Sequence, residues 1–155
     1  MTCLFELSIA LLITLLNGFF VMAEYSLVRI RKSRLDELIR QGKSRANTVL
    51  KMSEKLDTYL SATQLGITAS SLLLGWFGGP LLAEMFRGMF GVSAGTWYDH
   101  SLVFACAFLI IVFLHVVFGE LVPRTIALGK VEQVAMAVAY PLVFFHYLLY
   151  PLVVL

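Results

Sequence analysis

The sequence predicts an all-α integral membrane protein with three transmembrane helices, cytoplasmic amphipathic helices after the first, and a further apolar helix at the C-terminal end. Hydrophobic residues make up 59% of the 155 residues and charged residues only 14%, which is too apolar for a soluble domain. The apolar residues form runs close to the roughly 20 residues that span a bilayer. Nine of the twelve Lys and Arg lie between Arg29 and Lys55, so the positive charge is gathered in one connection.

The first predicted span covers residues 4–28 and contains the polar residues Glu6, Asn17 and Glu24. It stops at the basic run that starts with Arg29. Loops rich in Lys and Arg stay on the cytoplasmic side, so we expect the N-terminus outside and the protein in the plasma membrane, the inner membrane of a bacterium. The basic run follows an apolar span and includes acidic residues, so a juxtamembrane segment explains it better than a nucleic-acid site.

Residues 33–56 carry apolar side chains at spacings of three and four between charges, with a break near Gln41 and Gly42. This periodicity is typical of amphipathic helices. We expect two short helices that lie on the inner face of the membrane.

The second predicted span begins near Tyr59 and runs to Trp76, where glycines and Pro80 interrupt it before an apolar piece at residues 81–90. Gly75 and Pro80 predict a broken or kinked helix. Residues 91–100, which include Trp97 and Tyr98, are typical of an outer loop with interfacial aromatic residues.

The third predicted span covers residues 101–118 and returns the chain to the cytoplasm. The last apolar run, residues 134–155, contains Pro141 and Pro151. Its length allows a fourth span, whereas its prolines also suit a bent and partly inserted hairpin. Because no polar tail follows this run, we expect the sequence to be a fragment of a longer one.

Polar side chains inside a bilayer cost free energy and are therefore candidates for function. Asn17 and Glu24 are seven residues apart, on one face of the first span. A carboxylate and an amide there can bind a cation. Alternatively, Glu24 pairs with the basic cluster that starts at Arg29, and Asn17 bonds to a neighbouring helix.

A second candidate is a stripe of small and polar residues on the second span. Its members recur at spacings of three and four, which places them on one helix face: Ser61, Gln64, Thr68, Ser71 and Gly75. Their oxygens can replace part of the hydration shell of an ion. The same stripe also lets two helices approach closely in lipid.

The third candidate is Gly119 with Glu120 at the end of the third span. Pro123 removes a backbone donor, so we expect the helix to open and to present carbonyl oxygens beside the Glu120 carboxylate. Mg²⁺ binds oxygen ligands of this kind and keeps several waters. The alternative is an ion pair between Glu120 and Arg124, four residues later.

The sequence offers little for other chemistry. His115 is a lone histidine in a span, for which a bond to a neighbouring helix is the common role. Cys3 and Cys106 are in separate apolar stretches. Since the sequence holds no catalytic triad order, zinc-protease motif or phosphate-binding glycine loop, we do not expect an enzyme.

Several of these segments together resemble the transmembrane domain of the CNNM/CorC family, which includes the bacterial hemolysin C-like proteins. The resemblance covers nearly the whole chain, so we expect residues 1–155 to form one transmembrane domain of this type. The segments that carry it are Asn17-Gly18-Phe19-Phe20 with Ala23-Glu24, the basic run from Arg29 to Arg34, Tyr59-Leu60-Ser61-Ala62-Thr63-Gln64-Leu65-Gly66, and Gly119-Glu120-Leu121-Val122-Pro123-Arg124-Thr125-Ile126-Ala127.

The resemblance implies a homodimer that exports Mg²⁺, driven by Na⁺ entry. It also implies an ion site made by Glu120 and the Gly119 carbonyl, with polar side chains of the first two spans. In family members a pair of CBS modules that binds adenine nucleotide follows the membrane domain. No CBS pair is present in these 155 residues, so we expect no nucleotide site among them.

The sequence departs from the family pattern at two places. Val21 and Ala23 stand where the best-studied members carry serines, and Ile67 and Thr68 stand where they carry an Asn-rich motif. Gln64, Thr68 and Ser71 offer substitute oxygens. Two hypotheses follow: a dimeric divalent-cation transporter domain, or a membrane anchor or sensor that moves attached CBS modules or contacts a partner. An occluded Glu120 paired with Arg124 would favour the anchor.

Overall fold

The computed structural model describes residues 2–90 and 97–153, and the described part consists of helices joined by short connections. This confirms the predicted all-α fold class. The elements in chain order are α1 (Thr2–Arg29), α2 (Lys32–Arg40), α3 (Ser44–Glu54), α4 (Leu56–Phe90), α5 (Trp97–Leu114), the π-helical segment η1 (His115–Leu121), α6 (Val122–Gly129) and α7 (Val131–Val153).

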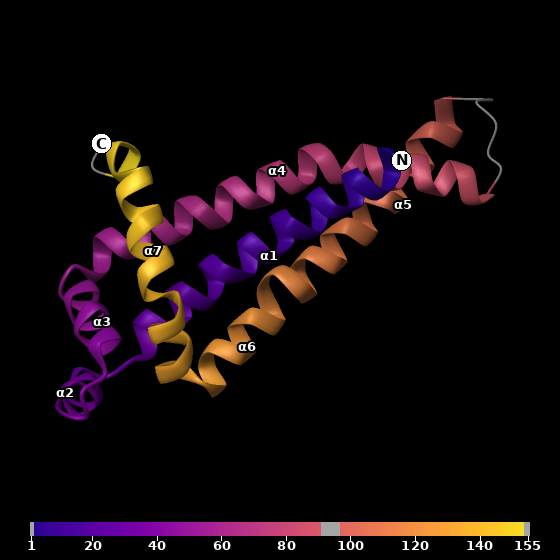
Figure 1. Cartoon of the computed structure of the whole chain (residues 1–155). Helices are drawn as coiled ribbons and strands as arrows, with labels where there is room; N and C mark the ends of the chain where they lie inside the picture. The colour runs from indigo at the N-terminus through magenta and orange to yellow at the C-terminus, as the bar shows by residue number, and fades with distance from the viewer. Residues whose placement is uncertain (1, 91–96, 154–155) are drawn as a thin grey trace.

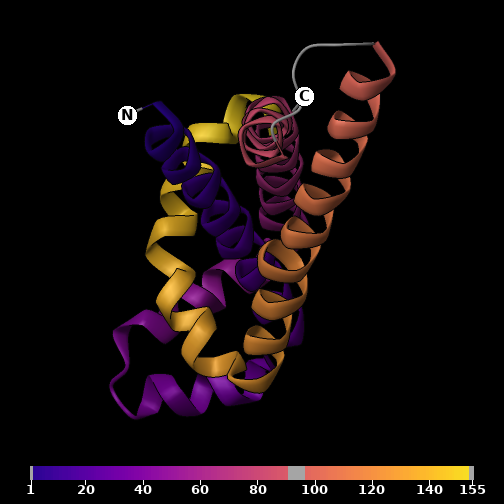
Figure 2. The same cartoon turned by 90° about the vertical axis from the view of Figure 1, so that its right-hand side faces the viewer.

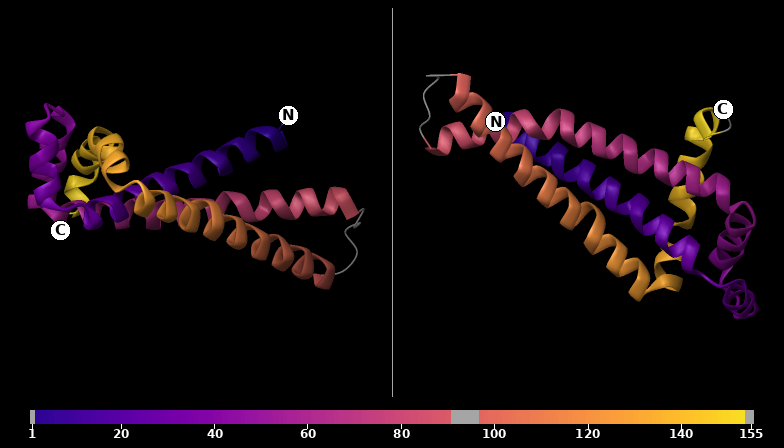
Figure 3. Two further views of the ribbon diagram at one scale, coloured as in Figure 1. Left: turned by 90° about the horizontal axis from the view of Figure 1, so that it is seen from below. Right: turned by 180° about the vertical axis from the view of Figure 1, so that it is seen from behind.

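Three long helical stretches run side by side: α1, α4, and the continuous stretch formed by α5, η1 and α6 (Figures 1 and 3). α7 crosses this bundle obliquely at the end where α2 and α3 lie, and packs on both α1 and α4. Figure 2, turned by 90°, shows α7 on the opposite side of α1 and α4 from α5 and α6. The basic segment and α7 therefore surround one end of the bundle.

Within the described residues, three segments are long and apolar enough to cross a membrane: Leu7–Arg29, Phe108–Gly129 and Val131–Leu148. The first and second correspond to predicted spans one and three. The third is α7. α4, the predicted second span, is not among the three segments found in the part of the chain that the structure describes. It nevertheless packs along α1 for much of its length.

The helix breaks predicted from glycine and proline residues do not occur in α4 or α7. α4 continues as one helix through Gly75 and Pro80 to Phe90. α7 is likewise one helix through Pro141 and Pro151, so it is not a hairpin. The predicted outer loop at 91–100 is partly helical, because α5 begins at Trp97; residues 91–96 lie outside the described residues.

The turn between α2 and α3 lies where the sequence predicts it. Gly42 has a φ of 80°, which suits glycine, and its N–H donates to the Ile39 carbonyl at 2.9 Å. The Lys43 N–H donates to the Leu38 carbonyl at 3.1 Å. These two bonds form a Schellman cap, which ends α2 and turns the chain into α3.

The apolar faces of α2 and α3 are buried inside the protein. Leu35, Leu38, Val49 and Met52 are at most 1% exposed and belong to one core with residues of α1 and α7. Their periodicity is therefore explained by packing of α2 on α3 and of α3 on α7 and α1, without a membrane surface. Burying an apolar side chain of this size stabilises the fold by about 1.5–3 kcal/mol.

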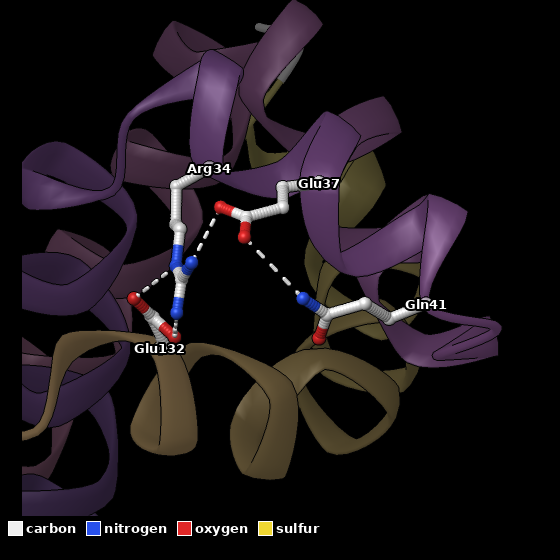
Figure 4. A network of polar contacts seen from close by, with 4 residues as sticks. All are labelled: Arg34, Glu37, Gln41 and Glu132. Carbon is white, nitrogen blue, oxygen red and sulfur yellow. Dashed lines mark hydrogen bonds and ion pairs between the residues drawn. The ribbon is translucent and has the colours of Figure 1, made fainter.

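An ionic network joins α2 to the start of α7 (Figure 4). The Arg34 guanidinium donates to Glu132 Oε1 at 2.6 Å and Oε2 at 3.2 Å, and it also pairs with Glu37. The hydrogen bonds to Glu132, and then those to Glu37, raise the pKa of Arg34 above its ordinary value. Arg34 therefore stays charged and has its positive charge matched by two carboxylates.

Candidate functional site

Two glycines let α1 lie very close to its neighbours. A Cβ at Gly66 of α4 would lie 2.6 Å from atoms of the Phe20 ring, and a Cβ at Gly18 would lie 2.9 Å from Cγ of Pro123. No side chain larger than hydrogen fits at either contact without movement. α4 and the η1–α6 junction are thus drawn against α1, the helix that carries Asn17 and Glu24.

The helix widens to a π-helix over His115–Leu121, where Gly119 and Pro123 were predicted to open it. Pro123 is four residues after Gly119 and has no N–H, so the ordinary α-helical bond to the Gly119 carbonyl cannot form. Instead, Asn17 Nδ2 of α1 donates to this carbonyl at 2.9 Å. Pro123 thus leaves the Gly119 carbonyl without its usual backbone donor, and the Asn17 side chain of α1 supplies a donor instead.

The surroundings of this bond are buried and incompletely satisfied. Asn17 is 1% exposed, and its Oδ1 accepts no hydrogen bond from the described residues. His115 Nε2 is also buried and without a hydrogen-bond partner there. Within the described residues, His115 Nε2 thus does not make the predicted bond to a neighbouring helix. Its ring is so close to Gly119 that a Cβ on this glycine would lie 3.0 Å from His115 Cδ2.

A cleft of about 390 Å³ lies between α1, α4 and η1. The Gln64 side chain is a hydrogen-bond partner of the half-buried Glu24 carboxylate, and the Glu120 carboxylate is near enough to repel it. The cleft therefore brings together four of the predicted site residues, Glu24, Gln64, Thr68 and Glu120. Its other lining residues are Val21, Tyr25 and Ile67.

Three predicted ligands are not among the residues that line the cleft. Asn17 is seven residues before Glu24 on α1, about 10 Å along the helix axis, and it bonds to Gly119 there. Ser71 donates to the Ile67 carbonyl of its own helix at 2.9 Å. The structure thus separates a polar cleft from a buried Asn17–Gly119 pair.

The stripe on α4 has two kinds of surroundings, because Gln64 and Thr68 line the cleft beside α1 whereas Gly75 has no close neighbour. Ser61, Gln64, Thr68 and Gly75 are exposed, and a Cβ at Gly75 would have nothing within 4 Å. The close contact between α4 and α1 is at Gly66, which lies outside the stripe and is buried against Phe20. The stripe residue Gly75 makes no such contact with the described residues.

Glu120 is exposed and is not paired with Arg124. The Arg124 guanidinium lies over the Tyr25 ring, 4.6 Å from its centroid, in a cation–π contact. In the part of the chain that the structure describes, the ion pairs are those of Arg34 with Glu37 and Glu132. The Glu120 carboxylate thus remains available to a ligand in the cleft.

The cleft offers both charged and neutral oxygen ligands. Among the side chains that the structure describes, no group of three or more from His, Cys, Asp or Glu is placed to hold a metal. Two carboxylates, one amide and one hydroxyl form a set suited to a hard cation that keeps part of its water shell.

Comparison with known sequences matches most of the chain to one family. The family described as "Cyclin M transmembrane N-terminal domain" matches residues 7–155.

The chain belongs to the CNNM family.

Curated relatives of this CNNM domain are bacterial. UPF0053 protein YugS of Bacillus subtilis (strain 168) is 41% identical over 89% of the chain, and UPF0053 protein YrkA of the same strain is 38% identical over 96%. Uncharacterized protein Rv1841c of Mycobacterium tuberculosis (strain ATCC 25618 / H37Rv) is 41% identical over 86%. The chain spans 32% of YugS, 34% of YrkA and 38% of Rv1841c, about a third of each relative.

The two departures from the CNNM serine pattern lie in different surroundings. Val21 lines the cleft, so a hydroxyl at that position would add an oxygen to it. Ala23 is 0% exposed within the core and does not line the cleft.

The sequence reasoning missed the walls of this CNNM cleft, which are Val21, Tyr25 and Ile67. Helical spacing holds the signal that could have found them. Val21 is three residues before Glu24, and Ile67 is three after Gln64, so each lies on the face of a predicted polar residue.

Proposed function

We propose that this chain is the membrane domain of a divalent-cation transporter, with Mg²⁺ as the transported ion. The observation that carries the proposal is the cleft that Glu24 and Glu120 line together with Gln64 and Thr68, with Glu120 near enough to act electrostatically on Glu24. Two carboxylates in one membrane cleft repel each other, so a cation between them stabilises both charged forms.

In this proposal the ion first enters the cleft, where Glu24 and Glu120 attract it and the Gln64 and Thr68 oxygens replace some of its waters. The Gly119 carbonyl is next to Glu120 and now accepts from Asn17. A cation that reaches this carbonyl replaces Asn17 Nδ2, and the unpartnered Asn17 Oδ1 can then turn toward the ion.

A second cavity lies beyond the Asn17–Gly119 pair, which fits alternating access. It has a volume of about 270 Å³ and lies between α1, α4 and α5, with His115 in its lining and apolar residues such as Leu7, Leu11 and Leu74. The Asn17–Gly119 pair lies along α1 between this apolar cavity and the polar cleft. We therefore propose that breaking the Asn17–Gly119 hydrogen bond opens the path from the polar cleft to the apolar cavity.

The wider context follows the family resemblance. We propose a homodimer in the plasma membrane, with the N-terminus outside, Na⁺ coupling, and cytoplasmic CBS modules in the longer protein. The exposed stripe on α4 and the many exposed apolar residues of α5 and η1 leave room for lipid and a second copy. We propose neither a catalytic activity nor a nucleotide site for these residues.

The anchor or sensor hypothesis predicts an occluded Glu120 that pairs with Arg124. The exposed Glu120 and the placement of Arg124 over Tyr25 do not support it. We therefore favour transport.

The test is thermal unfolding of the purified protein in detergent with increasing Mg²⁺, Ca²⁺, Mn²⁺ or Na⁺. A ligand that binds only the folded state raises the midpoint with concentration and stabilises the fold by about 2.7 kcal/mol at one hundred times its Kd. We expect Mg²⁺ to raise the midpoint, and Glu120→Gln to remove this response while the protein stays folded.

The matched control is Glu54→Gln, which removes an exposed carboxylate of α3 away from the cleft and should keep the Mg²⁺ response. A full response in Glu120→Gln would contradict the site. No response of the unaltered protein to any of the four ions would contradict the proposed function. Mg²⁺ flux into liposomes, measured with an enclosed indicator, then separates transport from binding.

A further inference from the structure

A small basic pocket lies where α1 ends, α2 begins and α7 starts. It has a volume of about 200 Å³ and lies away from the ion cleft. We call it the arginine pocket; its lining residues are Arg29, Ile30, Arg31, Arg34, Val131 and Glu132. Three arginines and one glutamate are therefore among the residues that line this small space.

The charges of the arginine pocket are not balanced by the protein. Arg34 is held by Glu132 and Glu37, and Figure 4 shows its guanidinium between the two carboxylates. Arg29 and Arg31 are both exposed, and neither has a carboxylate within 4.0 Å among the described residues. Two positive charges thus border the pocket without a partner, which favours an anion there.

The backbone adds to this preference. α2 begins at Lys32, and its N-cap residue Arg31 is extended and makes no side-chain capping bond. The first N–H groups of a helix have no partner within the helix, and they attract anions. In α2 the Arg34 N–H donates to the Arg31 carbonyl at 3.1 Å. The N–H groups of Lys32 and Ser33 are therefore the ones that can add to the attraction beside Arg31, a residue that lines the pocket.

The position of the pocket indicates which anion. Arg29 is the last residue of the apolar segment Leu7–Arg29, and the preceding Val28 is 58% exposed. The pocket therefore lies at the border between hydrocarbon and water, with an exposed apolar side chain beside it. A molecule with a phosphate and acyl chains matches both the basic pocket and the apolar surface beside it, whereas free phosphate matches only the basic pocket.

We propose that the arginine pocket binds the phosphate of an anionic phospholipid headgroup, with Arg29 and Arg31 as the groups that hold it. Basic pockets at the cytoplasmic ends of transmembrane helices recognise such headgroups. A lipid held there bridges the end of α1 to α2 and to the start of α7, beside the Arg34–Glu132 contact. This inference is independent of the proposed transport function.

The experiment is native mass spectrometry of the purified protein with phosphatidylglycerol or phosphatidylcholine, combined with thermal unfolding in the same detergent. We expect phosphatidylglycerol to bind in preference and to raise the unfolding midpoint. Each basic side chain near an anionic headgroup contributes about five-fold in affinity, so Arg29→Gln with Arg31→Gln should weaken binding about twenty-five-fold. Binding should also weaken with salt, because the groups are exposed.

The matched control is the double change Arg40→Gln with Lys51→Gln, which removes two exposed charges from the same basic segment but outside the pocket. It should keep the phosphatidylglycerol response. Size-exclusion chromatography checks that both double variants fold. If Arg29→Gln with Arg31→Gln binds phosphatidylglycerol like the unaltered protein, or if both double variants lose binding equally, the pocket assignment is wrong. If inorganic phosphate alone reproduces the stabilisation, the lipid assignment is overturned.

Discussion

Gly66→Ala should destabilise the fold by about 2–3 kcal/mol, because the added methyl group overpacks the contact between α1 and α4. A Cβ at this position would lie 2.6 Å from the Phe20 ring. That ring is 2% exposed and packs edge-on against Phe19 and Phe145, with centroids 5.3 and 5.1 Å away, so it cannot turn aside. Thermal unfolding in detergent measures the loss.

Gly75→Ala is the matched control on the same helix. A Cβ there would have nothing within 4 Å, so the change only replaces glycine with a better helix former. We expect an unchanged or slightly higher midpoint for Gly75→Ala. Equal midpoints for the two variants would show that α1 and α4 are not in close contact at Gly66. Because this contact holds Gln64 and Thr68 beside Glu24, Gly66→Ala should also weaken the response to Mg²⁺.

Asn17→Leu should cost about 1–3 kcal/mol, since it leaves a buried backbone carbonyl without a donor. Asn17 Nδ2 donates to the Gly119 carbonyl at 2.9 Å, and Pro123 cannot supply the N–H that an α-helix would offer. In a Pro123→Ala background residue 123 regains its N–H, so the same Asn17→Leu change should cost less. The two single variants and the double variant form a cycle that isolates this coupling.

Thermal midpoints of the four proteins measure the coupling, which we expect to be about 1 kcal/mol. Thr14→Val serves as a control on α1, because the Thr14 hydroxyl bonds only to the Ala10 carbonyl of its own helix at 2.8 Å. It should change the midpoint little in either background. An equal cost of Asn17→Leu with and without Pro123 would contradict the idea that Asn17 replaces the missing backbone donor.

Much of the fold follows from local sequence. Apolar runs and their charged ends predicted the all-α membrane fold class and the boundaries of the first span. Spacings of three and four, with a glycine at residue 42, predicted α2, α3 and the turn between them. Gly119 with Pro123 predicted where the third span opens. Each of these features depends on residues within a few positions of one another, so the sequence contains the whole signal.

The site was predicted as a set of residues, but only the tertiary structure shows which of them meet. Glu24 and Glu120 share a cleft with Gln64 and Thr68, whereas Asn17 bonds to Gly119 and Ser71 bonds to its own helix. Which helix faces meet depends on close contacts such as Gly66 against Phe20. Residues distant in the chain decide those contacts, so spacing along one helix cannot reveal them.

The sequence by itself therefore determined the kind of protein, the positions of its helical segments and the identity of its intramembrane polar residues. Only the tertiary structure decided that α7 crosses the bundle as a single helix, that the apolar faces of α2 and α3 are buried within the protein, and that Arg124 lies over Tyr25 and leaves Glu120 unpaired. The physical reason is that hydropathy and periodicity report how each helix is solvated. They do not report which buried face or charge of another helix will be its neighbour.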